Sequence, residues 1–330
     1  MTFKYKNVYV DNTSTVTGPY EAKGPIGKKF DRYYHDLYIN EKSFEKAEVR
    51  LLQDSIDILL EKTNNKKEDI DLIISGDLSN QISTSSYAVM KYDIPFLGIY
   101  SACSNSTEGI IIGSSLIDSK KVKNVIVSTS SHNMASEKQF RNPTEYGAPK
   151  PKTSTFTATG GASILLTNKK TDIKVYASTI GKVVDLGQKD PLHMGSIMAP
   201  AAADTIYRHL KDLNRQVDDY DMILTGDLGR VGKNILKDYM KANYGITLGD
   251  NYNDTGTMLY DLEKQKEVHS GGSGPVCCPL VCYSSILPKL KEKKIKRVLI
   301  AATGALFSPT FVFQHKEIHA ISHVVSLEVC

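Results

Sequence analysis

The chain has 330 residues and a mass of 36.5 kDa, which suits one large α/β domain or two units of about 150–170 residues each. Hydrophobic residues make up 41% and charged residues 24%, ordinary values for a soluble globular protein, so a collagen, a coiled coil and a disordered tail are excluded. The 41 basic and 37 acidic residues give a net charge of +4, which is too balanced to indicate nucleic-acid binding.

Alternating helix-like and strand-like segments fill the first half of the chain. Val49, Leu52, Ile56 and Leu59 recur at helical spacing, which predicts an amphipathic helix over residues 44–62. Short apolar runs predict buried strands at 72–74, 96–100, 122–128 and 162–166, with a helix at 104–119. Such alternation is typical of an α/β fold with a parallel sheet covered on both faces.

Two segments of the first half return later in the same order. Residues 71–78 read DLIISGDL, and residues 221–228 read DMILTGDL. The run VKNVIVST at 122–129 returns as IKRVLIAA at 295–302, and helix-like segments precede both copies. These matches predict a duplicated α/β unit, with one half at residues 1–170 and the other at 171–330.

Cysteine usage and the N-terminal sequence bear on the compartment. The five cysteines are an odd number and Cys277 and Cys278 are adjacent, so we expect a reducing compartment and no disulfide framework. The first ten residues, MTFKYKNVYV, contain no apolar core of a signal peptide. Apolar stretches such as 298–307 are too short to cross a bilayer, so any membrane association is expected to be peripheral.

Four motifs resemble the thiolase and ketoacyl-synthase superfamily. They are SACSNS at 101–106, TATGGASILL at 157–166, GGSGPVCCP at 271–279 and AATGAL at 301–306. The resemblance implies a thiolase-like duplicated fold with two similar halves in a layered α-β-α-β-α arrangement. It also implies that Cys103 lies on the turn into a buried helix, whose N-terminal amides and dipole lower the thiol pKa.

Longer runs resemble one branch of that superfamily, the family of stage V sporulation protein AD. These runs lie at 129–133, 139–147, 198–206, 224–228, 271–274 and 302–306. The resemblance implies a role in sporulation, in the uptake of dipicolinate into the developing spore. It further implies a peripheral location at the spore inner membrane, contact with other SpoVA membrane proteins, and a homodimer through the first half.

The acid–base partners of a condensing enzyme are missing at the positions that the superfamily resemblance assigns to them. Cys278 stands where thiolases have a catalytic His, the second thiolase Cys falls at or near Ala302, and a ketoacyl-synthase His would fall near Gly226. We therefore expect a binding protein without catalytic residues or cofactor. The alternative is an active Cys-dependent acyltransferase that uses Cys103 with His132 or His269. A third reading is a scaffold whose old pocket is empty.

The expected ligand is dipicolinate, alone or as its calcium chelate. Its two carboxylates require charge-assisted or backbone donors, and its flat ring requires a narrow apolar slot. The residues expected to line the site are Cys103, Ser104, His132, Arg141, Gly272 and Gly304. Cys277, Cys278 and Cys282 lack the spacing of a zinc site, so no metal is expected there. The basic run at 289–297 is expected to be a solvated helix end, with an anionic membrane surface as the alternative.

Overall fold

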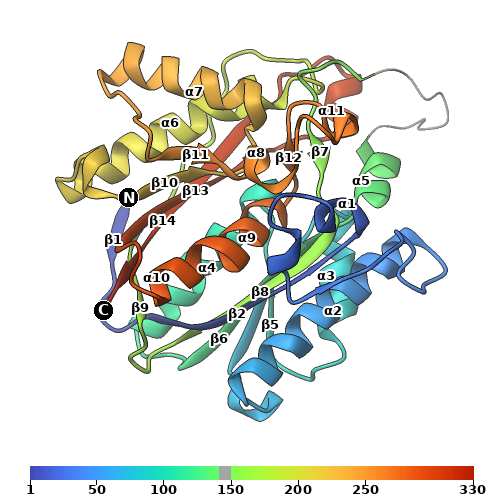
Figure 1. The fold of residues 1–330 in the computed structure, drawn as a ribbon, viewed down its shortest axis with the longest axis vertical. Coiled ribbons are helices and arrows are strands. Elements are labelled where there is room, and N and C mark those ends of the chain that lie inside the picture. The colour runs from blue at the N-terminus through green and yellow to red at the C-terminus, as the bar shows by residue number, and fades with distance from the viewer. Residues whose placement is uncertain (141–149) are drawn as a thin grey trace.

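A computed structural model describes residues 1–140 and 150–330. The predicted α/β class is confirmed: a large mixed sheet runs through the molecule and carries helices on both faces (Figure 1). The strands of the first half are β1 (Thr2–Lys4), β2 (Tyr9–Thr17), β3 (Arg32–Tyr33), β4 (Leu72–Gly76), β5 (Phe96–Gly98), β6 (Asn124–Ser131), β7 (Phe156–Thr157) and β8 (Gly160–Thr167). Its helices are α1 (Pro19–Ala22), α2 (Phe44–Thr63), α3 (Ser83–Val89), α4 (Asn105–Asp118) and α5 (Asn133–Phe140).

The second half adds further strands and helices of the same kinds. Its strands are β9 (Ile173–Thr179), β10 (Met222–Thr225), β11 (Tyr252–Asp254), β12 (Gly272–Ser273), β13 (Arg297–Ala305) and β14 (Ala320–Val329). Its α-helices are α6 (Met194–Leu213), α7 (Gly229–Tyr244), α8 (Thr255–Leu259), α9 (Cys277–Val281), α10 (Leu287–Lys291) and α11 (Pro309–Phe313). A π-helical turn at Cys282–Ile286 joins α9 to α10.

Strand order and direction are the same in the two halves. The sheet runs β11-β10-β13-β14-β9-β2-β8-β6-β4-β5, with β9 and β2 antiparallel at the centre. In the first half β4 is parallel to β5 and β6, while β8 is antiparallel to β6 and β2. In the second half β10 is parallel to β11 and β13, while β14 is antiparallel to β13 and β9.

The sheet is mixed, and this corrects the expectation of a parallel sheet. The strand predicted at 162–166 belongs to β8, which begins at Gly160 opposite Ser131, the last residue of β6. The chain thus enters β8 at the end of the sheet where it left β6. A parallel strand would require a crossover to the opposite end, so β8 runs back along β6.

Matching hydrogen bonds hold corresponding strands together in each half. A carboxylate oxygen of Asp71 accepts from the backbone N–H of Lys123 at 2.7 Å and of Asn124 at 2.9 Å. Asp221 accepts in the same way from Lys296 at 2.7 Å and Arg297 at 2.8 Å. These repeated bonds support the proposal that residues 1–170 and 171–330 are two copies of one unit.

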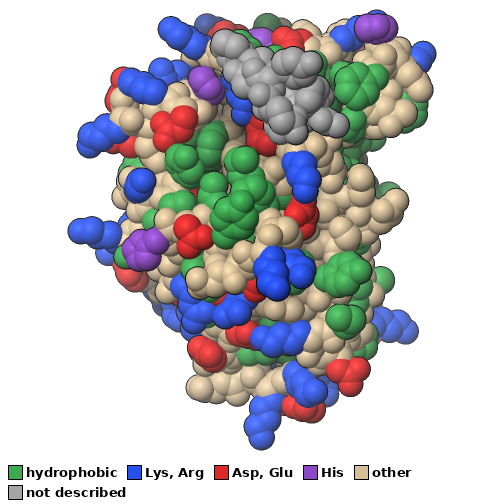
Figure 2. All heavy atoms as spheres, turned by 90° about the vertical axis from the view of Figure 1, so that its right-hand side faces the viewer, with side chains coloured by type: hydrophobic (Ala, Val, Ile, Leu, Met, Phe, Trp, Pro, Cys, Tyr) green, Lys and Arg blue, Asp and Glu red, His purple; other side chains and the backbone are tan. Residues whose placement is uncertain are grey.

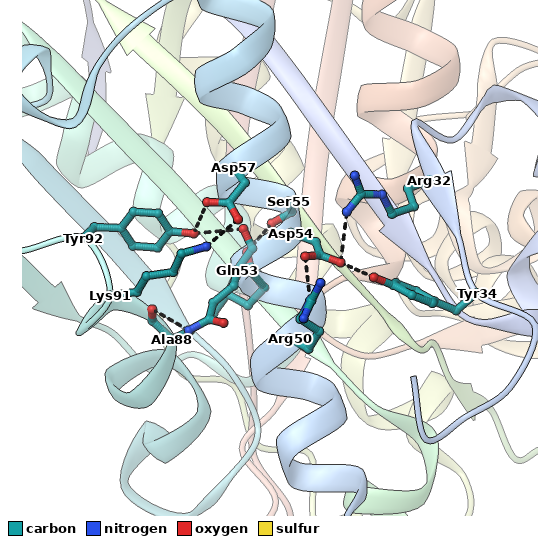
Figure 3. Close-up of polar contacts among 11 residues, drawn as sticks. Arg32, Tyr34, Arg50, Gln53, Asp54, Ser55, Asp57, Ala88, Lys91 and Tyr92 are labelled. Carbon is teal, nitrogen blue, oxygen red and sulfur yellow. Dashed lines mark hydrogen bonds and ion pairs between the residues drawn. The ribbon is translucent and has the colours of Figure 1, made fainter. Parts of the chain in front are cut away.

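The long helix α2 packs its apolar side on the sheet and its polar side on neighbouring loops. Leu51, Leu52, Ile56 and Leu59 are fully buried. On the other side, the buried carboxylate of Asp54 accepts from Arg50 at 2.8 Å and pairs with Arg32 at 3.2 Å, while Tyr34 donates to it (Figure 3). Ion pairs and hydrogen bonds of this kind offset the desolvation penalty of a buried carboxylate.

Hydrophobic side chains also gather on one outer face. Figure 2 shows them in the middle of the face that carries α2 and α5, with both basic and acidic side chains around them. Just before α2, the ring of Tyr38 is 51% exposed and stacks on Phe44, with 4.6 Å between ring centroids.

Candidate functional site

Cys103 lies in a tight turn between β5 and α4. A 3-10 turn, Ala102–Ser104, leads directly into α4, and Ala102 has a positive φ of 51°. The side chain of Asn105 accepts from the backbone N–H of Ser101 at 2.6 Å, which fixes the turn. Cys103 as a whole residue is partly exposed, whereas its neighbours Ala102 and Ser104 are buried. The turn therefore presents the thiol beside the N-terminus of a long helix.

Ser104 and Gly304 have structural partners at this turn. The Ser104 hydroxyl is buried and donates to the Ser101 carbonyl at 2.7 Å. A Cβ on Gly304 would lie 2.2 Å from the same carbonyl oxygen and 3.1 Å from the Cys103 nitrogen. Glycine is needed there because the end of β13 packs directly on the turn. Both residues thus lie at the expected site, and they shape it through the backbone.

The structure brings together the three positions where the superfamily's acid–base groups were expected. A Cβ on Gly226 would lie 2.8 Å from the Cβ of Cys278 and 3.5 Å from the Cα of Ala302. Gly226 follows β10, Cys278 belongs to α9 and Ala302 to β13. The space beside Gly226 is filled by Cys278, so an imidazole at 226 would require the α9 backbone to shift.

The environment of the Cys103 thiol differs from the expectation of a lowered pKa. Burial raises the pKa of Cys103 well above its ordinary value, and a negative charge on Asp227 raises it further. A hydrogen bond with the Gly274 backbone acts in the opposite direction and is the weaker effect. Desolvation thus outweighs the helix N-terminus, and the thiol is protonated at neutral pH.

Asp227 is a residue of the site that sequence reasoning missed. It follows β10 with a positive φ of 73°, and its side chain is 0% exposed. Within the described chain, no N–H or O–H group hydrogen-bonds to either carboxyl oxygen. Burial raises the pKa of Asp227 well above its ordinary value, helped by nearby Cys278 and Asp254, while the Cys277 thiol lowers it.

His132 is fully buried, and both of its ring nitrogens are used by the backbone. Nε2 lies 2.8 Å from the Leu37 carbonyl oxygen, and Nδ1 accepts from the Met134 N–H at 3.2 Å. The ring stacks on Phe44 with 5.2 Å between centroids, and burial lowers the pKa of His132. The imidazole is therefore neutral with its proton on Nε2. A role in ligand binding stays a prediction, and it would require one of these bonds to break.

The remaining expected residues have different placements. Gly272 pairs with Phe156, and a Cβ on it would lie 2.9 Å from the Cys277 sulfur. Gly274, with a φ of 99°, is the residue of the glycine-rich run whose backbone reaches Cys103. Arg141 lies outside the described residues. Among the described residues, no hydrogen bond links the ring of His269 to Cys103.

Two further findings concern metals and membranes. Within 1–140 and 150–330, no group of three or more His, Cys, Asp or Glu side chains could hold a metal ion. The Cys278 and Cys282 sulfurs are 3.9 Å apart, one helical turn from each other, and all five cysteines are free. None of the described helices combines the length and the apolar character that a bilayer span requires.

The fold is that of the thiolase-like condensing enzymes. It is similar to 3-oxoacyl-[acyl-carrier-protein] synthase III from Aquifex aeolicus VF5, at 13% identity and a TM-score of 0.56, covering 97% of this chain and 99% of that one. It is also similar to a variant of OleA from Xanthomonas campestris, at 13% identity and a TM-score of 0.61, covering 99% of each chain. At these identities the likeness concerns the fold alone.

Sequence comparison gives the family. The family model of Stage V sporulation protein AD (SpoVAD) matches residues 1–328, so the chain belongs to that sporulation family. The Stage V sporulation protein AD of Bacillus subtilis (strain 168) is 46% identical over 321 residues, which are 97% of this chain and 94% of that protein. The resemblance stated from the motifs is confirmed.

Proposed function

We propose that the protein binds dipicolinate, free or as its calcium chelate, beside Cys103 and takes part in dipicolinate uptake into the developing spore. The proposal rests on one observation above all. Cys103 stands where the resemblance places the nucleophile, and the buried acid Asp227, which has no N–H or O–H partner among the described residues, raises the pKa of its thiol. Membership of a sporulation family supports a role in that process.

The chemistry around Cys103 favours binding over turnover. A condensing enzyme needs a thiolate nucleophile, a donor to the thioester oxygen and a group that moves a proton. The Cys103 thiol has a raised pKa, and the ring nitrogens of His132 are occupied by the backbone. Gly226, Cys278 and Ala302 offer no acid–base group except a thiol, whose pKa is raised by Cys282 and by burial. We infer that the protein is a degenerate thiolase-like protein.

A calorimetric titration with dipicolinate tests the binding. We expect saturable binding by the wild-type protein and none by Cys103→Trp, whose indole would fill the space next to the thiol. Pyridine-2-carboxylate should bind about 5- to 150-fold more weakly, because a missing carboxylate leaves buried donors unpaired at about 1–3 kcal/mol. Equal uptake of dipicolinate by the wild type and Cys103→Trp would place the ligand elsewhere.

The alternative of an active acyltransferase has a separate test. The protein is mixed with a reactive acyl-CoA, and the mass of the chain is measured with and without Cys103→Ala. We expect no acyl mass on Cys103 and no steady-state release of CoA. Release by the wild type that Cys103→Ala abolishes would establish the acyltransferase. Thermal stabilisation by dipicolinate would exclude an empty scaffold, since a ligand that binds only the folded state raises its apparent stability.

The membrane side of the proposal concerns location and partners. We propose peripheral association with the spore inner membrane through other SpoVA membrane proteins. The hydrophobic cluster among charged side chains in Figure 2 offers one apolar surface for such a contact. The basic run offers another: Lys293 is exposed, and Lys294 pairs with Glu292 at 2.6 Å. Charge reversal at Lys293 and Lys294 should leave dipicolinate binding unchanged, and a weaker association with anionic vesicles would assign the contact to this run.

A further inference from the structure

Asp227 does not stabilise its own loop through hydrogen bonds as the equivalent aspartate of the first half does. It is the middle residue of the repeated Gly-Asp-Leu motif of the second half, and its counterpart in the first half is Asp77. Asp77 is equally buried, but its carboxylate accepts from the Ser79 N–H and the Ser85 N–H, each at 2.7 Å, and from the Ser79 hydroxyl. Asp77 thereby holds the loop after β4 in place, whereas Asp227 accepts no such bond.

A different acid carries out the corresponding task in the second half. Asp254, the last residue of β11, accepts from the N–H groups of Leu228 at 3.2 Å, Gly229 at 2.9 Å and Gly256 at 3.0 Å. Asp254 pairs with Thr225, and in the first half the corresponding pair is Gly98 with Ser75. Where the neighbouring strand has glycine, the motif's own aspartate holds the loop. Where the neighbouring strand has Asp254, that residue accepts the hydrogen bonds of the loop, and Asp227 accepts none of them.

The surroundings of Asp227 disfavour the ionised form of its carboxyl group. Its pKa responds to Cys278, Asp254 and Cys277, and it acts in turn on Cys103 and Cys277. None of these neighbours is a cation. A fully buried carboxyl group without a cation or strong donors holds its proton instead of ionising. A protonated carboxyl group is a strong hydrogen-bond donor, and here its polar neighbour is the weakly bonding Cys277 thiol, with no oxygen or nitrogen acceptor among the described residues.

We propose that Asp227 is the specificity-determining residue of the site, and that its protonated carboxyl group donates a hydrogen bond to a carboxylate of the bound ligand. The inference rests on the proposed function, because it assigns a donor for one of the two ligand carboxylates. A carboxylic acid and a carboxylate that face each other share one proton through a short, strong bond. The Gly274 backbone hydrogen-bonds with the same Cys103 thiol on which Asp227 acts.

This arrangement makes binding of the free acid weaken as pH rises. The groups that face Asp227 are the thiols of Cys103, Cys277 and Cys278 and the carboxylate of Asp254. Burial raises the pKa of Asp254 to about 6 and that of Cys277 well above its usual range, and the hydrogen bond with Cys282, together with burial, does the same for Cys278. Deprotonation of any of these groups adds negative charge, so each acts in the same direction. Above the pKa of Asp227, affinity should fall up to tenfold per pH unit.

The experiment is equilibrium dialysis of dipicolinate with the full chain between pH 6 and pH 9, with a calcium chelator present. Wild type is compared with Asp227→Asn and Asp227→Ala. The amide retains a donor, so Asp227→Asn should bind at pH 6 within a few-fold of wild type and lose part of the pH dependence. Asp227→Ala should bind at least fivefold more weakly at pH 6. Asp57→Asn, on the side of α2 that faces Tyr92 and Lys91 (Figure 3), is the control and should bind like wild type.

Four outcomes would overturn the inference. If Asp227→Ala binds like wild type while unfolding at the same temperature, Asp227 does not contact the ligand. If it binds weakly but its melting temperature falls by more than a few degrees, the role of Asp227 is structural. If affinity rises with pH and with calcium and Asp227→Asn abolishes it, the carboxylate binds the cation of the chelate. If wild type binds dipicolinate in neither form, the proposed function fails as well, and that result is distinguishable from the other three.

Discussion

The two Gly-Asp-Leu motifs end equivalent strands, yet their aspartates have opposite surroundings. Asp77 accepts three hydrogen bonds from its own loop, whereas Asp227, equally buried, accepts none from an N–H or O–H group of the described chain. The reason lies one strand away, in the exchange of Gly98 for Asp254 at the same register position. We therefore propose that one copy of the motif keeps a structural task while the other is free to contact the ligand.

The largest expected effect is on stability at Asp77. Asp77→Ala removes the acceptor of two backbone N–H groups, and that of Ser85 is buried. We expect a loss of about 3 kcal/mol in the free energy of unfolding, measured by urea denaturation. Asp227→Ala removes an unpaired buried acid and should change stability by less than about 1 kcal/mol. Equal losses in the two variants would show that the two aspartates have the same task.

Glu21 is an intermediate case between the two aspartates. One oxygen of this buried carboxyl group accepts from the Thr159 N–H at 3.0 Å and from the Tyr260 hydroxyl, and the other has no partner among the described residues. Burial raises the pKa of Glu21 to about 7. Because the folded state holds this proton more tightly than the unfolded chain, the contribution of Glu21 to stability falls as pH rises from about 4.5 to about 7, and then levels off.

Glu21→Gln tests that contribution. As pH rises from about 4.5 to about 7, the unfolding free energy of wild type should fall relative to that of the variant by up to roughly 3 kcal/mol. Urea denaturation at pH 5, 6, 7 and 8 measures it. The same difference at all four pH values would mean that Glu21 is not buried as a neutral acid.

The two outer edges of the sheet also differ. At the β11 edge, Tyr252 is 4% exposed and Asp254 is 0% exposed. At the β5 edge, Leu97 is 44% exposed, and Tyr87, Met90 and Tyr100 nearby in sequence are at least as exposed, at 65%, 74% and 44%. Uncovered edge strands with apolar side chains pair readily with another chain. We propose that the expected homodimer forms through β5.

Leu97→Asp tests the dimer. We expect light scattering to give a dimer for wild type at micromolar concentration and a monomer for the variant. Leu186→Asp, which changes a leucine that is 58% exposed far away in the sequence, should leave the dimer intact. A wild-type monomer would contradict the proposal.

The fold could be predicted from sequence to the extent that the two copies still share residues. Asp71 and Asp221 indicated the repeat, and both bind the backbone of the next parallel strand. The direction of β8 could not be predicted, because apolar periodicity is the same in parallel and antiparallel strands. It depends on which end of the sheet the chain enters.

Only those residues of the candidate site that lie in a recognisable sequence motif could be predicted. Cys103, Gly226, Cys278 and Ala302 were identified by motif, and the structure brings the last three together. Asp227 was missed because its sequence context matches that of Asp77, and the residue that distinguishes them lies on another strand. The use of both His132 ring nitrogens by Leu37 and Met134 depends on folding, which residue spacing does not reveal.

The smallest expected effect is on stability, in the turns that precede β6 and β13. It tests whether the two halves are equivalent there. Lys120 and Lys293 precede β6 and β13 by the same number of residues and have nearly the same positive φ, 60° and 58°. A lysine in this left-handed conformation costs roughly 1 kcal/mol relative to glycine. Substitution by glycine relieves that strain, but the greater conformational entropy of glycine in the unfolded chain offsets most of the relief. Lys120→Gly and Lys293→Gly should each change the free energy of unfolding by less than about 1 kcal/mol, and by the same amount within about 0.5 kcal/mol. Urea denaturation of both variants and of the double variant measures this, and the two changes should add because the turns belong to different halves of the sheet. If the changes in unfolding free energy of the two variants differed by more than about 1 kcal/mol, matching backbone geometry would not make these turns equivalent. The divergence seen at Asp77 and Asp227 would then extend to the amino ends of β6 and β13.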